Sequence, residues 1–332
     1  MTTAADSNSV LSPQSSVLSL RRQSATVATT GFRQRLVADL RRNRYVYLML
    51  LPVVVYYLIF HYGPMYGAII AFKDFSPAQG ILGSPWIGLQ NFQDFFSSVY
   101  LVRLLRNTLA INVLDIILGF PAPIILALLL NELTSQKFKR MVQTITYLPH
   151  FMSLVVVVGI IIDFLARDGL VNNLLAPFGV QPTPFMQEAG WYWILYVGSG
   201  IWQAVGWGSI IFLASIAAVD PTLYEAAVMD GASRFRQMWH ITLPGIMPMV
   251  VTLLILRIGM MMSIGYEKTL LMYNPSTFET ADVISSYVYR KGVLGMDYSF
   301  TAAVGLFNSV INFAFLIAAN RLARRMNQTS LW

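Results

Sequence analysis

The residues that could do chemistry are few, and none of them forms a catalytic grouping. The 332-residue chain has no cysteine, which excludes disulfides, thiolate nucleophiles and cysteine-bound metals. Its histidines, His61, His150 and His240, are scattered and lack the spacing of metal ligands. No G-x-x-x-x-G-K-[ST] segment occurs, so the chain has no P-loop for nucleotide phosphates. We expect no catalytic residue, no metal site and no cofactor bound by this chain.

Two ionisable side chains lie inside long apolar runs, where charge is costly and usually functional. Asp115 and Arg257 each stand about ten residues from the outer end of their run, roughly 15 Å deep at 1.5 Å per helical residue. We predict that they form a buried ion pair that orders a helical bundle. Contact with a substrate in a cavity and packing against a partner subunit are the alternatives.

Neutral polar and aromatic residues form a second group within the apolar runs. Asn308 and Asn312 share a helix face, as do Ser199 and Gln203. Amides that donate and accept hydrogen bonds, together with flat indole rings, would suit a neutral sugar. Hydrogen bonding between helices is the alternative for each polar residue, and the Met260–Met262 run is adaptable filler. The candidates for a substrate path are Trp202, Gln203, Trp207, Arg257, Asn308 and Asn312.

The elements that position these residues are predicted to be membrane helices. The chain is 56% hydrophobic and only 12% charged, with a mean hydropathy of +0.57. Several runs reach the roughly 20 apolar residues that cross a bilayer, which a soluble core helix rarely does. We predict an all-α polytopic membrane protein with six transmembrane helices, at residues 45–62, 105–130, 141–165, 191–218, 245–266 and 299–320.

The distribution of lysine and arginine predicts the orientation of these spans. With both termini in the cytoplasm, the inside segments hold 15 of the 23 basic residues, although the outer segments are together longer. The net charge of +7 therefore reflects topology, and we expect no nucleic-acid partner. The basic segment from Arg33 to Tyr45 is predicted to lie along an anionic membrane surface. It precedes no convincing cleavage site, which favours an uncleaved first span over a signal peptide.

The predicted organisation has four parts. Residues 1–32, rich in Ser, Thr and Ala, are expected to be a disordered cytoplasmic tail. Residues 33–104 hold the basic segment, the first span and an outer loop, and residues 105–320 hold a five-helix core. Residues 321–332 form a cytoplasmic tail. The outer loop contains Trp86 and Phe92 and is too apolar for a free linker, so we expect it to cover the outer mouth.

A short polar segment, residues 220–248, interrupts the apolar core. Asp220 is a good N-cap and Pro221 suits the first helical position. The Asp230-Gly231 pair marks a turn, because glycine can take the positive φ that ends a helix. A second helix then places an apolar stripe on one face, made of Phe235, Met238, Trp239 and Thr242. We predict a cytoplasmic helix-turn-helix, and an ordinary amphipathic loop on the membrane surface is the alternative.

This segment reads E-A-A-V-M-D-G-A followed by I-T-L-P-G-I-M-P, and it resembles the cytoplasmic signature of the membrane subunits of binding-protein-dependent ABC importers. Other stretches resemble an LplB-like branch of that family, which takes oligosaccharides and polysaccharide fragments. They are residues 60–75, 107–109, 119–132, 143–151 and 282–290 and the C-terminal S-L-W. The resemblance covers about residues 40–332. The matching signature positions are Glu225, Ala226, Ala227, Asp230, Gly231, Ala232, Ile241, Leu243, Pro244 and Pro248.

The resemblance implies a function in which this chain is not itself an enzyme. It would be a permease in the bacterial inner membrane, with residues 225–232 as a coupling helix that docks on a separate ATPase. The implied partners are a paralogous permease, two ATPase subunits that bind ATP and Mg²⁺, and an extracytoplasmic sugar-binding protein. An ion-gradient-driven transporter is the main alternative, although we find no internal repeat or interrupted half-helix pair. A membrane-embedded enzyme is disfavoured because catalytic groupings are absent.

Overall fold

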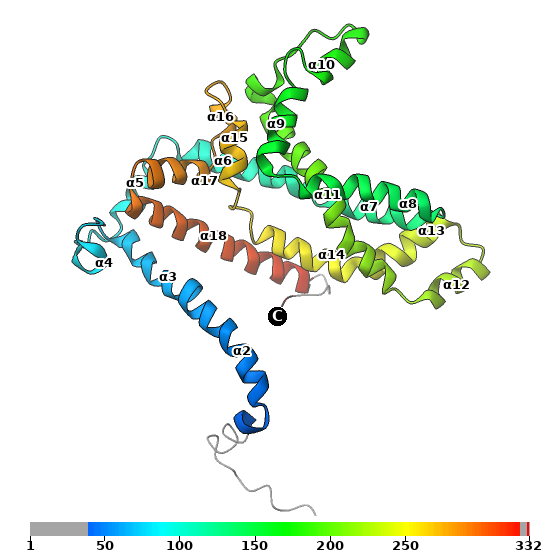
Figure 1. Ribbon diagram of the computed structural model, residues 1–332, viewed down its shortest axis with the longest axis horizontal. Coiled ribbons are helices and arrows are strands. Elements are labelled where there is room, and N and C mark those ends of the chain that lie inside the picture. Colours follow the sequence, from blue (N-terminus) through cyan, green and yellow to red (C-terminus); the bar gives the residue numbers. More distant parts are fainter. Residues whose placement is uncertain (1–38, 326–330, 332) are drawn as a thin grey trace, which may run out of the picture. The chain divides into compact units, whose positions relative to one another are not determined.

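The computed structural model describes residues 39–325 and residue 331, and these residues are helical with no β-strand (Figure 1). The predicted tail at 1–32 lies outside the described residues. Five helices are long and apolar enough to cross a membrane: Arg44–Phe72, Leu101–Glu132, Ala189–Ala217, Arg234–Ile258 and Tyr298–Arg325. A sixth candidate is a bent pair of helices. The predicted all-α membrane architecture is therefore confirmed.

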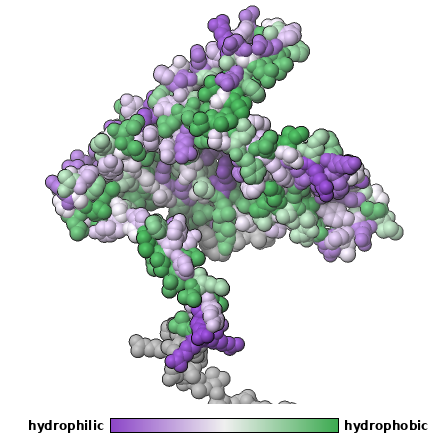
Figure 2. Space-filling view, in the orientation of Figure 1, coloured by the Kyte–Doolittle hydropathy of each residue, from purple (hydrophilic) through white to green (hydrophobic). Residues whose placement is uncertain are grey.

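The chain divides into two compact units, one up to Tyr66 and one from Gly67 onward. The described part of the first unit begins the helix that runs on to Phe72. Hydrophobic residues cover most of this first helix in Figure 2, and hydrophilic residues gather near its start. Its parts are α2 (Arg44–Tyr57), the π-helical η1 (Leu58–Tyr62), α3 (Gly63–Met65) and the 3₁₀-helical η2 (Tyr66–Phe72).

The second unit is built around four long helices. The first of them is made of α6 (Leu101–Leu114), the π-turn η3 (Asp115–Gly119) and α7 (Pro121–Glu132). The others are α11 (Tyr192–Ala217), then α13, η8 and α14 (Arg234–Gln237, Met238–Thr242, Leu243–Ile258), and α18 (Tyr298–Arg325). The shorter helices are α4 (Gly80–Gly83), α5 (Gln90–Phe96), α10 (Leu170–Leu175), α12 (Pro221–Met229), α15 (Tyr266–Met272), α16 (Phe278–Ala281) and α17 (Ile284–Val288). Short 3₁₀ or π turns are η5 (Ala176–Phe178), η6 (Phe185–Gln187), η7 (Ala189–Trp191) and η9 (Tyr289–Leu294).

The third predicted span, 141–165, is not one straight helix. α8 (Gln136–Tyr147) and α9 (Leu154–Phe164) meet at an angle of 106°. Between them the 3₁₀ turn η4 (Leu148–Phe151) contains Pro149, which cannot continue a helical hydrogen-bond ladder. Ser153 then starts α9 as an N-cap, because its side chain accepts a hydrogen bond from the Val156 N–H.

The fifth predicted span, 245–266, is also corrected by the structure. Its helix starts earlier, at Arg234, and ends at Ile258. Gly259 follows, and a Cβ there would lie 2.8 Å from Leu316 Cδ1, so glycine lets this helix end pack closely on α18. Asn312 on α18 then accepts a hydrogen bond from the Met262 N–H at 2.8 Å. Met260–Met262 therefore lie in a turn after the helix.

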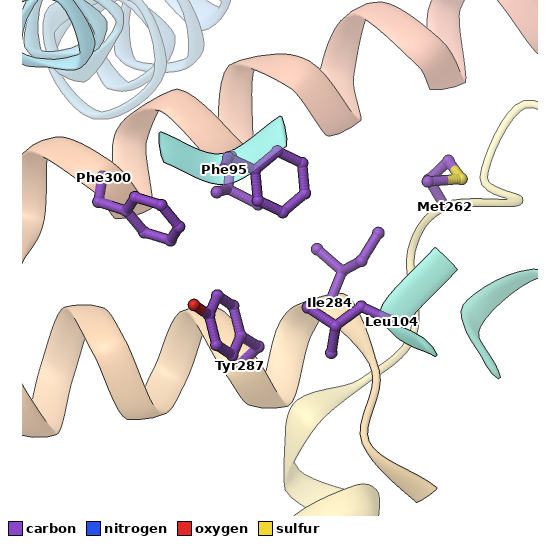
Figure 3. Packing of buried hydrophobic residues seen from close by; sticks show 7 residues of the cluster. Phe95, Leu104, Met262, Ile284, Tyr287 and Phe300 are labelled. Carbon is purple, nitrogen blue, oxygen red and sulfur yellow. The ribbon is translucent and has the colours of Figure 1, made fainter. Parts of the chain in front are cut away.

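A tightly packed cluster joins α5, α6, α17 and α18 at the end of the unit where α6 begins (Figure 3). Phe95 and Phe300 have ring centroids 6.1 Å apart, and Tyr287 lies 5.9 Å from Phe300. Leu104, Met262 and Ile284 fill the space beside these rings. Because lipid and core are equally apolar, such packing contributes mainly through close van der Waals contact.

The two ends of the second unit are well separated. The helix Leu101–Glu132 spans about 48 Å at 1.5 Å per residue. Arg234 at the start of α13 donates to the Glu132 carbonyl at 3.2 Å, so the α12–α13 segment lies at the far end of this helix from Leu101. Hydrophilic residues gather at this α8–α13 end in Figure 2. The second unit thus has a polar end at α8 and α13, away from the start of α6.

Candidate functional site

The segment between α11 and α14 forms the predicted helix-turn-helix. Asp220 caps α12, and its carboxylate accepts a hydrogen bond from the Thr222 N–H at 2.9 Å. Hydrogen bonds from the Thr222 backbone and side chain hold the pKa of Asp220 below its usual range. Pro221 occupies the first turn, where its missing N–H costs nothing. These local features explain why the helix begins directly after α11.

The turn between α12 and α13 depends on Gly231, whose φ is +71°. The Ala232 N–H donates to the Ala227 carbonyl at 2.8 Å, and the Gly231 N–H donates to the Val228 carbonyl at 3.0 Å. This is the left-handed helix ending that glycine favours, because a side chain would strain it. Gln237 then donates to the Ala232 carbonyl at 2.8 Å and closes the corner.

The second helix of the segment is anchored to the bundle. Phe235, Met238 and Trp239 line an apolar groove together with residues of α7, and the Phe235 and Trp239 rings lie 6.0 Å apart. Three of the four residues of the predicted stripe therefore face the first long helix of the unit. Tyr224 on α12 also contacts Thr242 through their hydroxyl oxygens at 2.9 Å. This contact links α12 to the residue directly before α14.

α12 itself presents a mixed surface that the described chain leaves uncovered. Leu223, Val228 and Met229 are exposed, Met229 by 87%. Glu225 and Ala226 are exposed too, whereas Ala227 and Ala232 are half-buried. Glu225 has no side-chain hydrogen bond or ion pair to the residues that the structure describes. An exposed acid among exposed apolar residues is suited to docking on another protein.

A cavity of about 370 Å³ lies between α7, α11 and α14. Asp115 and Arg257 lie on its wall and form an ion pair, with Arg257 Nε 2.9 Å from Asp115 Oδ2 and Arg257 Nη2 on the same oxygen. The structure thus brings together the two charges that the sequence paired. The pair is not sealed: the Arg257 side chain is 50% exposed, because α14 ends one residue later.

Two residues that shape this charge cluster were not singled out from the sequence. A Cβ at Gly119 would overlap the Asp115 carboxylate, so glycine makes room for that side chain beside the π-turn. Lys268 on α15 donates to the Tyr196 carbonyl at 2.7 Å and lies over the Tyr196 ring. Burial lowers the pKa of Lys268 to about 8, and the charge of Asp115 partly opposes that shift. A lysine directly after an apolar run was the available signal.

The uncharged candidates of the substrate path are distributed over two helices. On α11, Trp202 is exposed and Gln203 is half-buried, while Trp207 stacks on His150 at 4.6 Å. On α18, Asn312 is used by the fold, since its amide donates to Ser263 Oγ at 2.9 Å and its carbonyl accepts from Met262. Asn308 Oδ1 is buried without a partner in the described residues. None of these five lines the cavity of Asp115.

A buried lysine, Lys73, organises the loop before α6, and the sequence analysis did not identify it. Lys73 donates to the carbonyls of Ile81 and Ser84, at 2.7 and 3.1 Å, and lies over the Trp86 ring. Asn91 donates to the Ala71 and Lys73 carbonyls and pins α5 to this turn. The loop is therefore a folded structure, and Trp86 remains 62% exposed on it.

Comparison with known proteins assigns the chain to a family. The family described as "Binding-protein-dependent transport system inner membrane component" matches residues 119–328. Protein LplB of Bacillus subtilis strain 168 is 44% identical over 313 residues, which cover 94% of this chain and 98% of LplB. The polygalacturonan/rhamnogalacturonan transport system permease protein YteP of the same organism is 45% identical over 301 residues, covering 90% of this chain and 94% of YteP.

Solved structures agree with this assignment. A chain from the crystal structure of a bacterial ABC transporter involved in the import of the acidic polysaccharide alginate superposes with a TM-score of 0.81 at 41% identity, covering 89% of this chain and all of that one. A chain of the bacterial alginate ABC transporter bound to an alginate pentasaccharide-loaded periplasmic protein gives 0.82 at 40% identity, covering 90% and 100%.

These matches are to permeases and importers, as the sequence predicted, and they favour an ABC permease over an ion-gradient transporter or a membrane enzyme. The chain therefore belongs to the family of inner membrane components of binding-protein-dependent transport systems.

Proposed function

We propose that this chain is one of two permease subunits of an ABC importer that moves a complex oligosaccharide or polysaccharide fragment into the bacterial cytoplasm. The observation that carries the proposal is the uncovered α12 helix, which ends with the E-A-A-V-M of the signature and lies in the chain between two spanning helices. The substrate class follows the named relatives, a polygalacturonan/rhamnogalacturonan permease and an alginate importer.

The proposed partners supply what this chain lacks. With no P-loop of its own, the permease would rely on two ATPase subunits that bind ATP and Mg²⁺. A paralogous permease would complete the translocation path, and an extracytoplasmic binding protein would deliver the sugar. The alginate transporter forms a complex with an alginate pentasaccharide-bound periplasmic protein, which supports this proposal. The termini and α12 would lie in the cytoplasm, which agrees with the excess of basic residues there.

In the proposed mechanism, α12 is a lever between the motor and the bundle. ATP-driven closure of the ATPase pair would pull on Glu225 and the exposed residues around it. Tyr224 and the Gly231 corner would pass that movement to α13 and α14. Because α14 carries Arg257 on the cavity wall, its rotation would alter the cavity that contains Asp115. Access would thus alternate between the two sides of the membrane.

The experiment that tests this proposal is ATP-dependent uptake in liposomes that contain the complete importer with its binding protein. Glu225 would contact a basic group on the ATPase. Glu225→Lys should therefore insert normally but lower uptake and sugar-stimulated ATPase activity by about tenfold or more, since like charges at an interface cost several kcal/mol. Glu188→Lys is the matched control, because Glu188 is also exposed but lies near α11 and outside the coupling segment. Uptake by the purified chain without any ATPase subunit would refute the proposal.

A further inference from the structure

A second pocket, of about 520 Å³, lies where α6 begins, at the end of the unit opposite α12. Segments far apart in sequence contribute to it: the start of α6, α16, α17 and η9. Its volume is within the range of sites for small molecules. The lining residues are Tyr100, Arg103, Phe278, Tyr287, Arg290 and Lys291.

The pocket is positively charged, and a buried carboxylate holds two of its cations in place. Asp282 is completely buried and accepts hydrogen bonds from Arg103 Nη2 at 3.1 Å and from Arg290 Nη2 at 2.8 Å. Ser286 also donates to this carboxylate at 2.8 Å. One buried acid therefore positions two guanidinium groups, and Lys291 adds a third cation at the exposed rim. Glu279 pairs with Arg106 and does not line the pocket.

The two arginines retain hydrogen-bond donors that the fold does not use. Arg103 Nε and Arg290 Nη1 are buried and have no partner in the described residues. Such unsatisfied donors are unusual, and those of a charged group are costly. About a quarter of each side chain stays open, 30% for Arg103 and 26% for Arg290. Both arginines therefore line the pocket with part of each side chain open to a ligand, beside buried donors that the fold leaves without an acceptor.

Aromatic rings hold the cations and give the pocket flat walls. The Arg290 guanidinium lies 5.0 Å from the Phe278 ring centroid and 5.9 Å from that of Tyr287. Arg103 lies 5.0 Å from the Tyr100 ring, and the Tyr100 and Tyr287 rings are 5.9 Å apart. These contacts fix the guanidinium planes and reduce the entropy lost when a ligand binds.

We propose that this pocket binds the carboxylated ring of a uronic acid in the transported polysaccharide fragment. Arginine and lysine would hold the ring carboxylate through charge-assisted hydrogen bonds. The flat face of the pyranose would lie against Tyr100 or Tyr287. The inference rests on the proposed function and narrows its substrate to acidic chains, which enter through a cationic vestibule before the cavity of Asp115 and Arg257.

The size of the pocket favours a sugar ring over a protein surface as its occupant. A stable protein interface buries about 800 Å² on each partner, whereas this pocket has the size of one small ligand. An anionic lipid headgroup would offer the same kind of acceptor at a cationic site, but it brings no flat ring to the aromatic walls. The test therefore includes arms for both of these occupants.

The experiment measures binding of tri-galacturonic acid to the complete importer in nanodiscs, by calorimetry, without the binding protein. Its carboxyl-reduced counterpart is the neutral probe. We expect the acidic sugar to bind about tenfold more tightly than the neutral one. Lys291→Gln and Tyr100→Leu should each weaken binding of the acid roughly 3- to 10-fold. Arg167→Gln, which removes an exposed positive charge away from the pocket, should leave it unchanged.

Several outcomes would overturn this inference. They are equal affinity for both sugars, no binding of the acidic sugar, wild-type affinity in both pocket variants, or loss of acid binding when phosphatidylglycerol replaces zwitterionic lipid. If the pocket instead docks the binding protein, Lys291→Gln should weaken the docking of that protein on the importer both with and without bound sugar. ATP-dependent uptake of sugar with no preference for acid would refute only the inference. Acid binding without any ATP-dependent uptake would refute the proposed function alone.

Discussion

Two charged residues within the predicted spans form an ion pair whose role can be tested by substitution. Asp115 and Arg257 are 142 positions apart, yet Arg257 donates through Nε and Nη2 to one Asp115 oxygen. An exposed pair contributes little, whereas an isolated charge left in a buried site is strongly unfavourable. This pair lies between those limits, because Asp115 is 21% and Arg257 50% exposed on a cavity wall.

Reversal of one charge should therefore be destabilising and reversal of both should be tolerated. We expect Asp115→Arg or Arg257→Asp to lower the free energy of unfolding by about 1–3 kcal/mol, and the double swap to recover most of that loss. Thermal unfolding of the purified complex measures this. If the single variants unfold like the wild type but lose transport, Asp115 and Arg257 serve the substrate rather than the bundle.

At the scale of elements, close helix crossings depend on particular glycines. A Cβ at Gly206 on α11 would overlap the Thr146 carbonyl and lie 2.8 Å from Tyr147 Cδ1, both on α8. Gly198 on the same helix has no atom within 4 Å of its Cβ position. The close crossing of α8 therefore requires glycine at position 206, whereas no close contact requires it at position 198.

Gly206→Ala and Gly198→Ala form a matched pair of variants. We expect Gly206→Ala to destabilise the protein by about 1–3 kcal/mol, since the α8 backbone must move. Gly198→Ala should be neutral or stabilise by up to about 1 kcal/mol, because alanine favours helix. Melting temperatures of the two variants measure the difference. Equal melting temperatures would mean that the α8–α11 crossing is looser than the structure shows.

The α12–α13 corner is the second element whose backbone can be tested. Proline at position 231 cannot take the φ of +71° and would remove the N–H that bonds to Val228, whereas asparagine tolerates the left-handed region. We expect Gly231→Pro to insert but to lose sugar-stimulated ATPase activity, and Gly231→Asn to keep most of it. Full activity in Gly231→Pro would show that the corner does not transmit force.

At the scale of the whole molecule, the absence of cysteine makes topology simple to measure. Met229 on α12 and Val99 before α6 are each 87% exposed and lie toward opposite ends of the second unit. An impermeant maleimide should label Val99→Cys in right-side-out vesicles and Met229→Cys only in inverted ones. The ATPase subunits should then protect Met229→Cys. Labelling of both from one side would contradict the proposed orientation.

The sequence by itself determined the parts of this protein that depend on local pattern. Apolar length located the membrane helices, apart from the bend in the third span and the ends of the fifth. The Asp220 cap, the Gly231 turn and the stripe from Phe235 to Trp239 specified the helix-turn-helix. These signals are contained within one or two helical turns. They also carried the resemblance that led to the family.

Only the tertiary structure decided where helices break and which distant groups meet. A proline in an apolar run can kink, break or start a helix, and only the structure shows the 106° bend at Pro149, next to the close crossing of α8 and α11. Likewise, the pairing of Asp282 with Arg103 bridges 179 positions and leaves no periodic trace in the sequence. Long-range contacts form because several helices share one interior, so residue spacing within any one of them does not specify its partners.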